Sequence, residues 1–196
     1  MSIHERRERE RAERHQLIIR TARELAEAEG WEAVTTRRLA ERIEYSQPVL
    51  YSHFAGKDAI VAAVALEGFS ALAAELRLAV GKVDGPAEEF AAVARTYMGF
   101  AAANPALYDA MFTLATDLPF GGPDTPAPMK EGFAALAGPV ARVAGARDPE
   151  TFTEVAWAAL HGLVTLTRVG RLRPGLTEQR LALLVERLLG EAVDGG

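Results

Sequence analysis

The chain has 196 residues, of which 49% are hydrophobic and 25% charged, so it holds enough apolar material for one or two compact units and is not a disordered polypeptide. Because it has no cysteine, disulfide frameworks and thiolate metal sites are excluded, and because it has neither a run of about 18 apolar residues nor a signal peptide, we expect a soluble, cytoplasmic protein. The net charge of −5 is uneven, since residues 1–57 carry 11 basic and 10 acidic side chains whereas residues 58–196 carry 11 and 17, which favours different roles for the two parts.

The N-terminal segment alternates glutamate and arginine. This pattern predicts a solvated or frayed helical extension over His4–His15, with residues 1–12 flexible. The alternative is an arm that binds phosphates or the minor groove of DNA through Arg6, Arg7, Arg9 and Arg11.

The first firm helix is predicted from an apolar stripe that ends at Gly30, a residue type common just past a helix end. The stripe consists of Leu17, Ile18, Ala22, Leu25 and Ala26. Trp31 and Val34 follow it, and we expect both to pack in a small core.

Two short helices separated by a tight turn are predicted next. Thr35 is a good N-cap, and Leu39, Ala40 and Ile43 fall on one face of the helix that follows it. Ser46 is placed to cap a second helix from Gln47 to about Phe54, whose first turn tolerates Pro48 because the missing N–H would be unpaired there. Val49, Leu50 and Phe54 are its expected inward anchors.

The outward residues of the second helix suit a DNA groove. Gln47 has the amide that pairs bidentately with adenine, and Pro48 offers an apolar contact to a thymine methyl group. Tyr51 and His53 reach phosphates in such an arrangement.

In the order and spacing of these residues, the segment from about residue 10 to 65 resembles the tetracycline-repressor (TetR) family of transcriptional regulators. The resemblance implies an all-α fold with a helix-turn-helix DNA-binding domain at residues 1–57 and a helical effector-binding and dimerisation domain at residues 58–196. It also implies DNA contacts from Thr36, Arg37, Gln47, Pro48, Tyr51 and His53, with Lys57 holding a phosphate.

The turn departs from the family pattern at Glu44, which replaces a glycine that commonly adopts positive φ. A non-glycine residue in this conformation costs about 1 kcal/mol. A carboxylate close to DNA also weakens phosphate attraction, so Glu44 is the main sign of an alternative function, a ligand- or partner-binding module that has lost DNA recognition.

Beyond Lys57 the sequence is rich in alanine and shows no strand-like alternation, and its breaks predict five or six helices. The breaks lie at Gly81–Pro86, Asn104-Pro105, Leu118–Pro128, Gly145–Pro149 and Arg173–Gly175. Segment 118–128 is rich in glycine and proline, which is typical of a mobile loop beside a pocket or of an unconstrained loop.

A second resemblance, to the Trp/His-Gly (WHG-type) regulatory subfamily of the TetR family, lies in Asn104-Pro105-x-Leu107-Tyr108 and Trp157-x-x-x-His161-Gly162. The predicted effector-binding residues are Tyr97, Tyr108, Phe112, Trp157 and His161, flanked by Arg95, Asp109 and Lys130. This mixture favours a small, mainly apolar or aromatic effector. The alternative for His161 is a core or interface histidine.

The last two helices carry more apolar surface than one chain needs to bury, which predicts a homodimer with a four-helix interface. The predicted interface residues are Phe152, Leu160, Leu163, Leu181, Leu184 and Leu188. A dimer presents two DNA-binding domains to a palindromic operator, whose two half-sites lie about 34 Å apart. The alternative is that the two helices cover a monomeric core.

Taken together, these patterns predict a sequence-specific DNA-binding regulator, and the TetR resemblance implies a repressor released from its operator by the effector. The sequence has no His-Glu-x-x-His motif, no Glu-x-x-His pair and no phosphate-binding glycine loop, so we predict neither an enzyme nor a cofactor or metal site.

Overall fold

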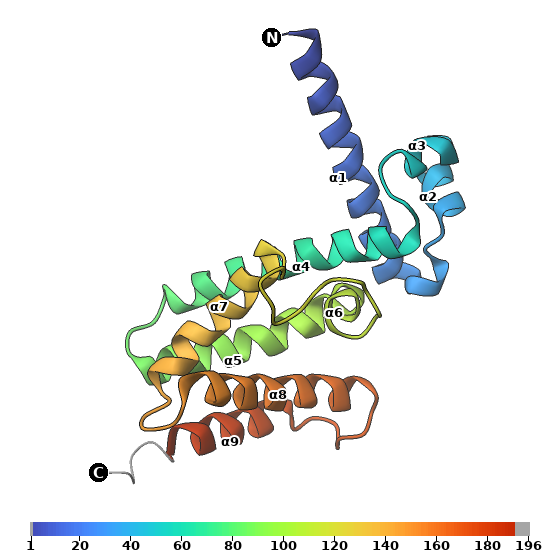
Figure 1. The fold of residues 1–196 in the computed structure, drawn as a ribbon. Helices are drawn as coiled ribbons and strands as arrows, with labels where there is room; N and C mark the ends of the chain where they lie inside the picture. The colour runs from blue at the N-terminus through green and yellow to red at the C-terminus, as the bar shows by residue number, and fades with distance from the viewer. Residues whose placement is uncertain (1, 191–196) are drawn as a thin grey trace. The chain divides into compact units, whose positions relative to one another are not determined.

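A computed structural model describes residues 2–190, and all regular secondary structure in this part of the chain is helical, without a β-strand. The helices form two compact units, which are coloured along the chain in Figure 1. The predicted all-α fold is confirmed. The predicted extension and C-terminal domain also include Met1 and residues 191–196, which lie outside the described residues.

Unit 1 contains residues up to Gly68 together with Asn104–Pro126. Its elements are α1 (Ile3–Glu29), the 3-10 turn η1 (Trp31–Ala33), α2 (Thr36–Arg42), α3 (Gln47–Tyr51), the first half of α4 (Lys57–Val80) and α6 (Pro105–Phe112).

Local signals explain where α1 begins and ends. The Ser2 side chain accepts a hydrogen bond from the Glu5 N–H while the Glu5 side chain accepts one from the Ser2 N–H, which is a complete capping box. At the other end, Gly30 adopts a φ of 83° and its N–H bonds to the Ala26 carbonyl, as the sequence predicts. Residues 3–14 are therefore helical, and residues 3–13 are exposed, which agrees with a solvated helical extension.

The core of the head, meaning α1, η1, α2 and α3, is formed by the predicted apolar residues. At most 1% of the surface is exposed in Leu25, Val34, Leu39 and Leu50. Thr35 caps α2 by accepting a hydrogen bond from the Arg38 N–H, as predicted.

Two details of the second predicted helix are corrected. Ser46 is at the N-cap position of α3, but its side chain makes no capping hydrogen bond. Helix α3 ends at Tyr51 instead of Phe54, because the chain continues as a turn in which the Phe54 N–H still bonds to the Leu50 carbonyl.

Unit 2 contains Phe69–Ala103 and the chain from Ala127 onward. Its helices are the second half of α4, α5 (Pro86–Ala103), α7 (Ala127–Arg142), α8 (Pro149–Arg168) and α9 (Thr177–Gly190). Helix α5 packs against α7, α8 and α9, and α8 packs against α7 and α9. The six helices that begin at or after Lys57 agree with the five or six predicted.

Helix α4 belongs to both units, so the domain boundary predicted after residue 57 remains a prediction. By length and composition alone α4 could cross a membrane, with a mean hydropathy of 1.8 over its most apolar window. Half of this window is buried within the protein, which is also the property of a core helix.

Candidate nucleic-acid interface

Helix α3 holds its predicted DNA-reading residues on the surface of the head. Leu50 is buried and anchors the helix, whereas Gln47, Pro48 and Tyr51 are exposed, Tyr51 to 54%. The Tyr51 hydroxyl lies 3.5 Å from the Thr36 hydroxyl, so the two helices of the motif present neighbouring polar groups. An amide, a phenol and a hydroxyl on one small surface are groups that contact base edges and phosphates.

Arg37 is exposed on α2 and pairs with Glu41 one turn later, with 2.9 Å between Nε and Oε1. Exposed pairs of this spacing contribute only about 0.3–0.5 kcal/mol. Arg37 can therefore exchange this carboxylate for a phosphate at little cost.

Lys57 opens α4, and its Nζ donates a hydrogen bond of 2.6 Å to the Trp31 carbonyl. An ammonium group has three N–H donors, so two remain for other acceptors. The side chain thus fixes η1 against the start of α4, and its predicted phosphate contact remains a proposal.

His53 is half-buried in the turn after α3, where its ring centroid lies 6.0 Å from that of His15. Burial is the largest cause that lowers the pKa of His53, followed by the positive charges of Arg11, His15 and Arg14. The imidazole is therefore more fully neutral at pH 7 than an ordinary histidine. It is suited to donate a hydrogen bond and is poorly suited to act as a cation.

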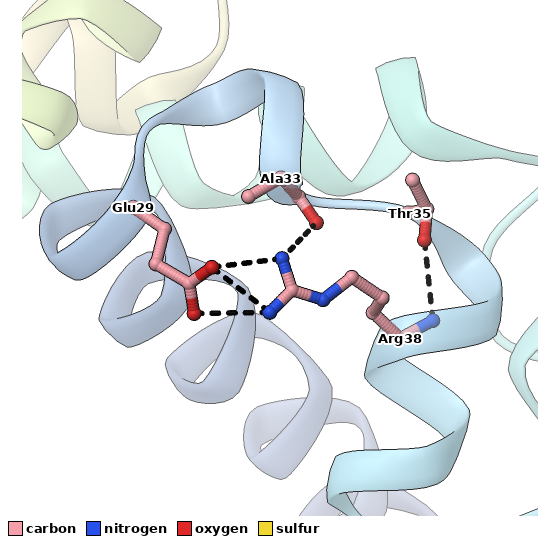
Figure 2. A network of polar contacts seen from close by, with 4 residues as sticks. All are labelled: Glu29, Ala33, Thr35 and Arg38. Carbon is pink, nitrogen blue, oxygen red and sulfur yellow. Dashed lines mark hydrogen bonds and ion pairs between the residues drawn. The ribbon is translucent and has the colours of Figure 1, made fainter.

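Figure 2 shows a contact between α1 and α2 that the sequence analysis did not identify. The Arg38 guanidinium donates to both carboxylate oxygens of Glu29, at 2.9–3.0 Å, and also to the Ala33 carbonyl. The Thr35 side chain accepts from the Arg38 N–H in the same network. A guanidinium that donates to both oxygens of one carboxylate has a defined geometry, so this network fixes the orientation of α2 relative to α1.

The turn between α2 and α3 contains a non-glycine residue with positive φ, Glu44, at 59°. This confirms the expectation that Glu44 adopts the conformation of the glycine it replaces. The Tyr45 N–H bonds to the Ala40 carbonyl, so the turn is closed despite the strain.

We expect Glu44→Gly to raise the free energy of unfolding by about 1 kcal/mol, because glycine has no β-carbon to clash in the left-handed region. It should also tighten DNA binding, since a carboxylate is removed. Glu44→Ala is the matched control: it removes the charge but keeps the β-carbon. Urea unfolding of the two variants separates the effects, and equal stabilities for glycine and alanine would contradict the strain.

A polar link joins the C-terminal half of α1 to the N-terminus of α6 within unit 1. The Glu27 carboxylate accepts hydrogen bonds from the N–H groups of Ala106 and Leu107, at 3.0 and 2.9 Å. These are two of the first N–H groups of α6, which lack partners inside the helix, so Glu27 caps α6 from another element. The Trp31 indole N–H donates to the Ala106 carbonyl at 2.7 Å, and Arg23 donates to the Asn104 side chain.

The predicted effector-binding residues fall into both compact units. In unit 2 the buried Tyr97 accepts a hydrogen bond of 3.0 Å from the Trp157 indole N–H, and the Trp157 ring lies 6.2 Å from that of His161. Burial lowers the pKa of His161. In unit 1 the rings of Tyr108 and Phe112 contact each other at 4.7 Å. The predicted residues thus belong to two different compact units, and their role in binding remains a prediction.

Arg95, predicted to flank the effector, lies on the surface of unit 2. It lines a hollow of about 300 Å³ together with Leu181, Val185, Glu178 and Glu186 of α9.

Three of the six residues predicted at the dimer interface are buried within their own chain, which corrects that part of the prediction. Phe152, Leu160 and Leu181 are no more than 5% exposed and belong to the core of unit 2, so they are not available to a partner. Leu163, Leu184 and Leu188 are half-buried. The exposed apolar residues near these helices are Val155, Leu166, Val169 and Leu183, with exposed fractions of 43–61%.

Family models match both parts of the chain. The model described as bacterial regulatory proteins of the tetR family matches residues 18–64. The model described as the tetracyclin repressor-like C-terminal domain matches residues 90–191, more than half of the chain. The chain belongs to the tetR family.

Curated proteins of known name match only part of this chain. Over 48 residues, 24% of this chain, it is 54% identical to the class C tetracycline repressor of Escherichia coli, and the match spans 22% of that protein. The chain covers at most 49% of the length of the curated relatives it matches.

Solved structures resemble nearly the whole chain. A protein of unknown function from Rhodococcus sp. RHA1 has a TM-score of 0.77 at 23% identity, covering 90% of this chain and 94% of the other. The regulator FadR from Bacillus subtilis, in complex with stearoyl-CoA, has a TM-score of 0.68 at 15% identity, covering 87% and 97%. These likenesses show a shared fold. The two family models confirm the predicted TetR resemblance, whereas the narrower WHG-type assignment remains a prediction.

Proposed function

We propose that this TetR-family chain is a sequence-specific DNA-binding transcriptional regulator, without enzymatic activity, in the cytoplasm. The observation that carries the proposal is the surface formed by Gln47, Pro48, Tyr51 and Thr36, which stands on a small buried core. Gln47 reads a base, Pro48 contacts a thymine methyl group, and Tyr51, Thr36, Arg37 and Lys57 hold phosphates. His53 supports this contact as a neutral donor.

The regulator acts as a homodimer on a palindromic operator. The support is an apolar row along α8, in which Val155, Ala159, Gly162 and Leu166 recur at spacings of four, three and four residues and so share one face. No atom lies within 4 Å of a β-carbon placed on Gly162, so a partner helix has room to approach closely there. Leu163, Leu184 and Leu188 lie at the margin of this surface in the proposed dimer.

The effector is a small, mainly apolar or aromatic molecule that releases the repressor from DNA. Support comes from the aromatic groups around Tyr97, Trp157 and His161, and from the structural similarity to FadR, which was solved with stearoyl-CoA. The effector works through its preference for the arrangement that does not bind DNA.

Selection from a randomised duplex library at moderate salt tests the proposal, because a dimeric regulator enriches an inverted repeat. Failure to enrich any sequence, with ligand binding retained, would favour a module that has lost DNA recognition.

On the selected DNA we expect Gln47→Ala to weaken binding about 10- to 100-fold and to relax the preference at one base pair of each half-site, because a bidentate amide contact is worth about 1–3 kcal/mol. Gln179→Ala is the control, since Gln179 is an exposed glutamine on α9. Repeating the selection with both variants gives the measurement. An unchanged sequence preference in Gln47→Ala would show that this residue reads no base.

A further inference from the structure

The first three turns of α1 extend the head as an exposed, regular helix. In Figure 1 these turns project beyond α2 and α3, with which α1 shares a compact unit. The Ser2–Glu5 capping box closes the N-terminus of this segment, so the side chains of residues 3–14 are presented on a helical scaffold. The charges on the different faces of this helix can therefore be compared.

Most of the acidic residues of this segment are paired within the helix. His4 pairs with Glu8 at 3.2 Å, and Arg6–Glu10 and Arg9–Glu13 pair at 3.6 Å. These ion pairs involve Arg6 and Arg9, two of the four arginines of the DNA-binding arm that the sequence analysis gave as an alternative.

The other two arginines of that predicted arm, Arg7 and Arg11, share one face of α1 with Arg14. Arg7, Arg11 and Arg14 are separated by four and three residues, which places them in a single row along the helix. Glu8 and Glu10 flank this arginine row, and each is held by its own partner, His4 or Arg6. The positive charge of the row is thus the least compensated charge of the segment.

Two contacts and one electrostatic effect indicate that the arginine row faces the end of α3. The Arg11 Nη2 donates to the Ser52 carbonyl at 3.2 Å, directly after α3. Arg11 and Arg14 both contribute to lowering the pKa of His53. The ring of His15 stacks on Phe54, with 4.4 Å between centroids. Arg7 lies one turn farther out than Arg11 on the same face.

We propose that the arginine row Arg7, Arg11 and Arg14 is a second DNA contact, which binds backbone phosphates flanking the bases read by α3. This inference rests on the proposed DNA-binding function. It commits to duplex DNA because the row carries the complementary charge and because it is continuous with the α3 surface through Arg11 and Ser52. Phosphate contacts of this kind fix the position of a protein on DNA without reading sequence.

The test is the salt dependence of binding to the DNA that the wild-type protein selects. Arg7→Ala should lower the slope of log affinity against log salt by about 0.9, the value for one phosphate contact. Its affinity deficit relative to the wild type should then grow about threefold between 0.2 M and 0.05 M salt. The deficit should be the same for selected and unrelated sequences, because the contact is to phosphate.

Arg9→Ala is the matched control. It also removes one positive charge from an exposed position of the same helix, but Arg9 lies on the opposite face. We expect its salt slope to equal that of the wild type. Equal slopes and affinities for Arg7→Ala and Arg9→Ala would overturn the arginine row, with the proposed function intact. If the wild-type protein binds no DNA at all, the proposed function itself is wrong, and the row fails with it.

Discussion

Replacing Trp31 with alanine is expected to lower the free energy of unfolding by about 3–5 kcal/mol, the usual cost of removing a buried tryptophan. Trp31 is only 8% exposed, and its indole N–H donates to the Ala106 carbonyl. Alanine leaves a cavity and removes the hydrogen bond from the indole to the Ala106 carbonyl. Urea unfolding can follow this change, because Trp157 remains as a fluorescent reporter in the variant.

Trp31→Phe separates the two contributions, because it keeps most of the packing and loses the hydrogen bond. We expect it to cost about 0.5–1.5 kcal/mol, the usual net contribution of one hydrogen bond. A loss below about 1 kcal/mol in Trp31→Ala would show that unit 1 does not depend on this link.

The second large effect is expected for Glu27→Ala, with a loss of about 2–4 kcal/mol in the free energy of unfolding. A hydrogen bond to a charged group contributes about 1.5–3 kcal/mol, and Glu27 makes two, which its partial exposure weakens. Pro105 has no N–H, and Ala106 and Leu107 have no other acceptor at the start of α6 once the carboxylate is gone. The variant should therefore fray α6.

Glu24→Ala provides the control for this experiment. Glu24 is exposed on the same helix, one turn earlier, so its removal changes the net charge equally. We expect a change within about 0.5 kcal/mol, as for most surface substitutions. Thermal and urea unfolding that fail to distinguish the two variants would contradict the capping role of Glu27.

The local features of the head were predictable because each depends on a few adjacent residues. Thr35 has the side chain that caps a helix, Gly30 has the freedom that ends one, and Glu44 occupies a turn that requires positive φ. The proline and glycine breaks located the helices after residue 57 for the same reason.

Contacts between distant segments had no such signal. Glu27 lies 79 residues from Ala106, and Arg11 lies 41 residues from Ser52, so no spacing rule connects them. Glutamate and arginine are also common on exposed helix faces, so neither residue type by itself indicates a contact between distant elements.

The list of predicted dimer-interface residues was partly wrong for a related reason. The amphipathic pattern of α8 and α9 shows which residues are apolar, but it does not show whether a given leucine packs inside its own unit or against another chain. Leu160 of α8 and Leu181 of α9 are in the core, whereas Val155 and Leu166 of α8 are exposed.

The continuity of α1 has a mechanical consequence. The helix runs from Ile3 to Glu29 without interruption, so Arg7 and the Glu27 contact with α6 lie on one rod, about 30 Å apart at 1.5 Å per residue. A tilt of about 5° around the Glu27 end displaces Arg7 by about 2.6 Å over this length. Such a shift exceeds the tolerance of a hydrogen bond, whose donor and acceptor are normally about 2.7–3.2 Å apart. In the proposed DNA contact, a tilt of this size would therefore move the Arg7 end of α1 out of reach of a phosphate.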